Sequence, residues 1–138
     1  MIYFIPNNPK TLTLLTAGQR LLSDRTKWCK GSMKQGQRYC LNGALLKVGT
    51  PYQALPADYI SDHPMYYIGR IPRGAIPEPF WFLRQALSKM SKFDNIGRFN
   101  DDPDTTHQEV LGLLKSAIEL VECEIKQSKQ DRLDDRAA

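Results

Sequence analysis

The strongest constraint on the fold is one long amphipathic stretch near the C-terminal end of the chain. Its apolar residues recur close to the 3.6-residue period of an α-helix: Val110, Leu114, Ala117, Ile118, Val121 and Ile125. Either Thr105 with Gln108 or Thr106 with Glu109 has the spacing of a capping box, which marks a helix start. The pattern predicts a helix from about residue 105 to residue 128 or beyond. Core contact is expected to fade after Ile125.

Shorter patterns predict two further helices and one hairpin in the first third of the chain. Asn8 before Pro9 is typical of a helix opening, and leucines spaced along residues 9–24 continue the helical pattern. Residues 26–39 alternate around a polar tip and predict a β-hairpin with Gly36 in its turn. A short apolar helix is expected to follow over residues 41–48.

The remaining segments complete an α+β domain that is mainly helical. Residues 50–79 are rich in proline and aromatic residues and are expected to wrap the body of the protein. A helix is predicted over residues 78–92, and a loop over residues 93–103. We therefore expect a compact single domain over residues 1–128 with a small β-hairpin. Residues 129–138 are expected to form an exposed helical extension or a flexible tail.

Composition supports a globular protein without external reinforcement. A chain of 138 residues with 41% hydrophobic residues can bury an ordinary core without disulfides or a structural metal. No apolar run approaches the roughly 18 residues of a membrane-spanning helix, and no basic region precedes the N-terminal apolar run. The three cysteines are odd in number, widely spaced and without a CxxC pair. A cytoplasmic protein with reduced thiols, no membrane partner and no cofactor is expected.

A surface of tyrosines and basic residues is the leading candidate for ligand binding. The net charge of +4 mildly favours anionic partners. Aromatic faces beside guanidinium groups are the pairing that stacks bases and neutralises phosphates. The candidates are Tyr66, Tyr67, Arg70 and Arg73, extended by Lys27, Lys30, Lys34 and Arg38 of the predicted hairpin. The alternative is that these tyrosines pack on the core and the arginines stay solvated.

Cys40 and His107 are the candidate catalytic pair. Cys40 is expected at a helix N-terminus, where the helix dipole stabilises a thiolate, and His107 would then act as its base. The alternative, which we favour, is a buried structural cysteine and a surface histidine.

An acidic turn ahead of the last helix offers a second kind of chemistry. Asn100, Asp101, Asp102 and Asp104 carry the hard oxygen ligands that Mg²⁺ and Ca²⁺ prefer. The same side chains also cap exposed N–H groups at a helix start, and we favour this interpretation over a metal site.

The last helix also carries a possible interface. Its exposed residues alternate in sign: Glu119, Glu122, Glu124, Lys126, Lys129, Asp131 and Arg132. Such alternation is typical of a solvated helix or of a pairing surface. Both a plain solvated face and a homodimer through this helix are compatible with the pattern.

Four short segments resemble one family. They are Trp-Cys-Lys-Gly at 28–31, Tyr-Cys-Leu-Asn-Gly-Ala-Leu at 39–45, Phe-Asn-Asp-Asp-Pro at 99–103 and Thr-His-Gln-Glu-Val at 106–110. The chain resembles an uncharacterised family of small bacterial and phage proteins over residues 10–48 and 96–121. The resemblance implies a small, mostly helical cytoplasmic domain, often encoded by a phage or mobile element.

Together these features favour a non-catalytic binding or inhibitory protein. Its expected partner is a host protein, a nucleic acid or a nucleotide, and the resemblance makes counter-defence a candidate role. The alternative is a small enzyme that depends on Cys40 and His107.

Overall fold

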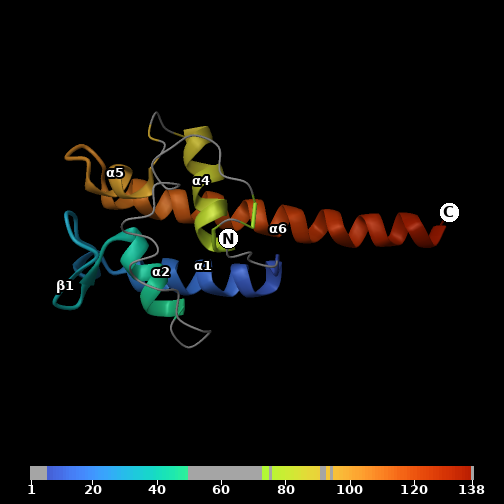
Figure 1. Ribbon diagram of the computed structural model, residues 1–138, viewed down its shortest axis with the longest axis horizontal. Helices are drawn as coiled ribbons and strands as arrows, with labels where there is room; N and C mark the ends of the chain where they lie inside the picture. The colour runs from blue at the N-terminus through green and yellow to red at the C-terminus, as the bar shows by residue number, and fades with distance from the viewer. Residues whose placement is uncertain (1–5, 50–72, 75, 91–92, 94, 138) are drawn as a thin grey trace.

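The long helix α6 (His107–Ala137) organises the structure. The computed structural model describes residues 6–49, 73–74, 76–90, 93 and 95–137. Helices α1 (Asn8–Ser23) and α4 (Glu78–Met90) pack against α6, and α2 (Leu41–Gly49) packs against α1 (Figure 1). The predicted fold class, α+β with mainly helical content, is confirmed.

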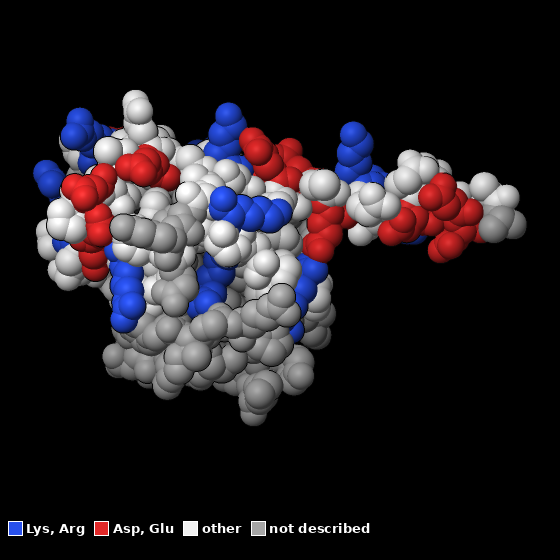
Figure 2. Space-filling model, turned by 90° about the horizontal axis from the view of Figure 1, so that it is seen from above, with Lys and Arg blue, Asp and Glu red and all other residues white. Residues whose placement is uncertain are grey.

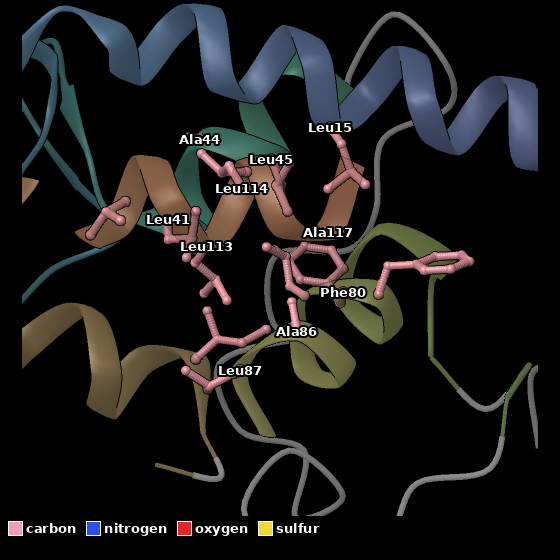
Figure 3. Packing of buried hydrophobic residues seen from close by; sticks show 14 of the residues in the cluster. Leu15, Leu41, Ala44, Leu45, Phe80, Ala86, Leu87, Leu113, Leu114 and Ala117 are labelled. Carbon is pink, nitrogen blue, oxygen red and sulfur yellow. The ribbon is translucent and has the colours of Figure 1, made fainter. Parts of the chain in front are cut away.

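The core lies where the apolar faces of these four helices meet. Leu15 of α1, Ala44 of α2, Phe80 of α4 and Leu114 of α6 are completely inaccessible to solvent. In Figure 3 their side chains converge between the helices, together with Leu41, Leu45, Ala86, Leu87, Leu113 and Ala117. Full burial of a side chain as large as Phe80 contributes about 1.5–3 kcal/mol to stability.

The start of α6 follows the second of the two predicted capping boxes. The Thr106 hydroxyl accepts a hydrogen bond from the Glu109 amide at 3.1 Å, and the Glu109 carboxylate accepts one from the Thr106 amide at 3.0 Å. At the other end, the helix continues to Ala137. Every residue from 126 to 137 is exposed, so this part of α6 projects from the body as a bare helix (Figure 1).

Two predicted boundaries are wrong: the start of α1 and the extent of the hairpin. The cap of α1 is Asn7 rather than Asn8, because the Asn7 side chain is the one that accepts the Lys10 amide, at 3.1 Å. The hairpin is shorter than residues 26–39 and pairs only β1 (Lys34–Gln35) with β2 (Arg38–Tyr39). A 3₁₀ turn, η1 (Arg25–Lys27), occupies the first part of the predicted strand.

A short helix stands where a loop was predicted. α5 (Ile96–Asp101) is capped by Asn95, whose side chain accepts the Arg98 amide at 3.0 Å. Its apolar residues Ile96 and Phe99 are buried. A single turn and a half offers too little periodicity to be recognised from the sequence, whereas packing against α2 and α4 stabilises it.

Arg73 links the three helices α1, α4 and α6 through its guanidinium group. Its guanidinium donates two hydrogen bonds to the Glu124 carboxylate, at 2.6 and 2.7 Å, and one to Glu78 at 2.9 Å. It also contacts Asn8 of α1 at 3.4 Å and lies 4.9 Å from the centre of the Trp81 ring. The carboxylate of Glu78 is nearly inaccessible, so Arg73 provides the charge compensation that its burial requires.

We expect Arg73→Gln to destabilise the protein by about 2 kcal/mol, because it leaves a buried carboxylate without its cation. The hydrogen bonds of Arg73 lower the pKa of Glu124 below the ordinary glutamate value of about 4.3. The stability from this pair is therefore complete above that pH and is lost as pH falls through the lowered pKa. Urea unfolding between pH 7 and pH 3 should show that the difference in the free energy of unfolding between variant and wild type becomes smaller in acid. A difference that stays constant with pH would contradict a stabilising ion pair between Arg73 and Glu124.

Candidate ligand-binding cleft

Buried Asn100 of α5 holds the loop that precedes the hairpin. Its side-chain oxygen accepts hydrogen bonds from the Trp28 indole at 2.8 Å and from the Leu41 amide at 3.1 Å. Its side-chain nitrogen donates to the Cys29 carbonyl at 3.0 Å. One asparagine therefore links α5, the start of α2 and the Trp28–Cys29 segment, which are distant in the sequence.

The next residues of the loop are held by the acidic turn. The Asp101 carboxylate accepts the Gly31 amide at 2.8 Å, and the Lys30 ammonium donates to the Asp102 carbonyl at 2.6 Å. Lys30 also lies 5.3 Å from the centre of the Trp28 ring. The positive φ of 84° at Gly31 lets the chain turn here.

This anchored loop forms one wall of an open cleft of about 460 Å³ at the hairpin end of the molecule. Seven of the described residues, from η1, the loop and the hairpin, line it: Arg25, Thr26, Trp28, Cys29, Lys30, Gln35 and Arg38. Three of them are cationic and none is acidic. The cleft therefore favours an anion.

Two of these cations are free to bind a ligand. The side chains of Arg25 and Arg38 are exposed, and neither has a hydrogen-bond or ion-pair partner within the described ranges. Lys30 differs, since its ammonium already donates to two carbonyls of the acidic turn. Unpaired guanidinium groups are the side chains best suited to bind phosphate or carboxylate oxygens.

The cleft contains part of the surface predicted from the sequence. Lys30 and Arg38 line it, whereas Lys34 lies on β1 with its ammonium 5.8 Å from the centre of the Tyr39 ring. Arg73 lies elsewhere, within the contacts to Glu78 and Glu124. Tyr66, Tyr67 and Arg70 fall outside the described residues.

Sequence reasoning missed Arg25 as a cleft residue. Its position depends on η1, which is capped by Asp24. The Asp24 carboxylate accepts the Thr26 amide at 2.9 Å. The Asp-x-Thr spacing is a recognisable turn signal, but the direction in which Arg25 points depends on the tertiary structure.

Cys40 stands at the start of α2, as predicted, but its surroundings disfavour a thiolate. Its sulfur accepts the Gly43 amide at 3.3 Å, and burial raises the pKa of the thiol to about 11. His107 is engaged elsewhere, with its Nε2 2.6 Å from the Leu22 carbonyl and its ring 5.7 Å from the Trp28 ring. A cysteine nucleophile needs a lowered pKa and a nearby base, so this geometry gives no support to a Cys–His enzyme.

Thiol reactivity tests this description directly. Cys123 is exposed on α6, whereas Cys29 and Cys40 are buried and burial raises the pKa of both thiols. We expect one thiol per chain to react promptly with a chromogenic disulfide at pH 8, and all three after unfolding in guanidinium. Cys123→Ser should abolish the prompt reaction. Rapid labelling of Cys40 in the folded protein would contradict this assignment.

Two carboxylates of the acidic turn, those of Asp101 and Asp102, form hydrogen bonds inside the chain. Asp101 accepts the Gly31 amide and Asp102 accepts the Asp104 amide at 2.9 Å. The start of α6 is capped by Thr106 instead of these acids, so the predicted capping role becomes one of holding loops. Across the described ranges, no three histidine, cysteine or acidic side chains are grouped as metal ligands.

The fold and the cleft define a small, mainly helical α+β protein with a basic cleft beside its hairpin. The model of a family of unknown function (DUF6197) matches residues 6–120, and the chain belongs to this family. No curated protein and no solved structure is significantly similar to the chain. None of the described helices is both long and apolar enough to span a bilayer.

Proposed function

We propose that this chain is a non-catalytic binding protein whose basic cleft binds the phosphate groups of a nucleotide or a single-stranded nucleic acid. The observation that carries this proposal is the pair of unpartnered guanidinium groups, Arg25 and Arg38, on one open cleft. The ammonium of Lys30, fixed at 2.6 Å from the Asp102 carbonyl, adds a third positive charge at a set position.

Phosphate contacts, more than base stacking, are expected to provide the affinity. Lys30 lies over the Trp28 ring and His107 packs beside it, so the indole is only partly open to a base. The volume of about 460 Å³ falls in the range of small-ligand sites and accommodates one nucleotide. A nucleic acid would extend past the cleft along the exposed Lys34 of β1.

The test is fluorescence anisotropy with labelled poly-dT and poly-U oligonucleotides, followed by competition with ATP and with inorganic phosphate. Arg25→Gln combined with Arg38→Gln should weaken binding about 10-fold or more, because two phosphate contacts are lost. For single strands the slope of log K against log salt should fall by about 1.4. If ATP displaces the labelled oligonucleotides and poly-dT and poly-U bind equally well, the cleft is a nucleotide site.

Arg20→Gln combined with Lys47→Gln is the matched control, because both residues are exposed and neither is among the described residues that line the cleft. This control removes the same net charge and should retain the affinity. Equal losses in the two double variants would show nonspecific electrostatics and contradict the cleft. Absence of binding to all four probes would contradict the proposal as a whole. The inhibitory, phage-encoded role implied by the resemblance stays a prediction.

A further inference from the structure

Two exposed hydrophobic side chains lie among opposite charges at opposite ends of the molecule. Within the described ranges, Met90 (48% exposed) and Leu133 (57% exposed) are the large hydrophobic residues that solvent reaches most. Met90 ends α4, and Leu133 lies on the bare end of α6. Each belongs to a surface with a distinct charge.

The surface around Leu133 is basic. Positions three, four and seven residues away share its side of a helix. They carry Lys126, Lys129, Gln130, Arg136 and Ala137, of which three are basic and none is acidic. Asp131, Asp134 and Asp135 are one or two residues away and therefore point to other sides. Both signs of charge are visible along the projecting end of α6 (Figure 2). We call Lys126, Lys129, Leu133 and Arg136 the Leu133 face.

Among the described residues, the charged side chains that line a cleft at Met90 are acidic. A cleft of about 200 Å³ has Met90, Phe93 and Phe99 as its apolar lining. Of the described residues, Thr105 and three acids also line it: Asp102, Asp104 and Glu109. The carboxylate of Asp104 is exposed and has no hydrogen-bond partner in the part of the chain that the structure describes. We call this the Met90 cleft.

We propose that the Leu133 face docks into the Met90 cleft of a second copy of this chain, and that the exchange is reciprocal. Leu133 would fill the apolar lining while Lys129 and Arg136 meet the carboxylates. The charges and the apolar residues of the two surfaces are complementary, and each chain carries one of each. A two-fold axis then closes the assembly at two chains with two equal contacts.

Docking within one chain is excluded by the straightness of α6. The Met90 cleft lies beside the N-terminal turn of this helix, at Glu109, and Leu133 lies about 36 Å farther along it at 1.5 Å per residue. Figure 1 shows the bare end of α6 pointing away from α4 and α5.

Sedimentation equilibrium of the full chain from 1 to 200 µM is the test. We expect wild type to approach twice the chain mass of 15.8 kDa. Leu133→Glu and Met90→Glu should each raise the dimer dissociation constant about 100-fold, because each removes an apolar anchor from both contacts. Ser128→Glu adds the same charge on another side of α6 and should leave the dimer intact. Circular dichroism checks that every variant is folded.

Mixing gives the sharpest result. Leu133→Glu retains an intact Met90 cleft and Met90→Glu retains an intact Leu133 face, so the mixture can form one of the two contacts. We expect the equimolar mixture to associate more strongly than either variant alone. Lys129→Glu should also dissociate the dimer, and adding Asp104→Lys should restore it.

Three outcomes would overturn the proposal. They are a monomer at every concentration, a dimer indifferent to Leu133→Glu and Met90→Glu, and mass that grows without limit with concentration. The last would mean head-to-tail contacts that do not close. The test uses no nucleotide or nucleic acid, so its result is independent of the proposed function.

Discussion

Replacing Gly43 with alanine is expected to destabilise the protein by about 4 kcal/mol or more, because it forces two backbones apart. A Cβ at this position would lie 1.9 Å from the Met33 carbonyl oxygen and 2.9 Å from its carbon. These are main-chain atoms beside the hairpin, and the same carbonyl accepts the Cys40 amide at 3.3 Å. Urea unfolding followed by circular dichroism measures the effect.

Gly112 is the matched control, since it is a glycine inside a helix with nothing within 4 Å of its would-be Cβ. Gly112→Ala should stabilise the protein by about 0.5–1 kcal/mol through helix propensity alone. Opposite signs are therefore expected for the same chemical change. A Gly43→Ala protein as stable as wild type would show that α2 does not approach Met33 as closely as described.

The second large effect is expected at Asn100, where alanine should cost about 3–4 kcal/mol. The change leaves the Leu41 amide, the Cys29 carbonyl and the Trp28 indole without their partner, and unsatisfied buried polar groups cost about 1–3 kcal/mol each. Partial relaxation and water entry reduce the sum. Thermal unfolding together with tryptophan fluorescence reports both stability and the environment of Trp28.

Asn100→Asp keeps the volume of the side chain and changes only its polar group, so it measures the effect of the polar contacts alone. It keeps the acceptor for Trp28 and Leu41 but places a carboxyl in a buried site beside Asp101. Burial and the neighbouring charge should raise the pKa of this carboxyl above the ordinary aspartate value of about 3.9. The variant should therefore be closest to wild type in acid and lose stability as pH rises above that value. A pH-independent deficit would contradict the buried position of Asn100.

Anion binding should also be sensitive to Asn100, although this residue does not line the cleft. Its contacts to Trp28 and Cys29 hold the cleft wall that carries Lys30. Under conditions in which the Asn100→Ala protein is still folded, it should thus bind oligonucleotides more weakly than wild type, although the substitution leaves the net charge unchanged.

Local patterns were sufficient for the helices with strong periodicity or a strong start signal. The capping box at Thr106, the stripe of α6 and the short apolar α2 each depend on residues within a few positions of one another. By contrast, α5 was missed because its stability comes from burial of Ile96 and Phe99. The role of Asn100 in joining three segments could not be deduced from its neighbours in the sequence.

The candidate site was only partly predictable for the same reason. Lys30 and Arg38 were recognised as basic residues near a hairpin, and both line the cleft. Arg25 depended on a 3₁₀ turn in place of the expected strand. Arg73 has the same chemistry as these residues, but it is held by Glu78 and Glu124 from distant parts of the chain. Residue type indicated binding capacity, and only the partners decided which arginines are free.

By itself, the sequence determined the fold class and the long last helix, and it limited the cap of that helix to two capping boxes, because hydrophobic periodicity and capping act over a few residues. The structure selected the box of Thr106 and Glu109. The tertiary structure alone decided which charged side chains form ion pairs or hydrogen bonds within the chain and which face solvent. It buried Cys40, whose thiol has a pKa of about 11, and left Arg25 and Arg38 open on one cleft. Desolvation and ion pairing depend on contacts between segments as far apart as Arg73 and Glu124, and no local pattern encodes such distances.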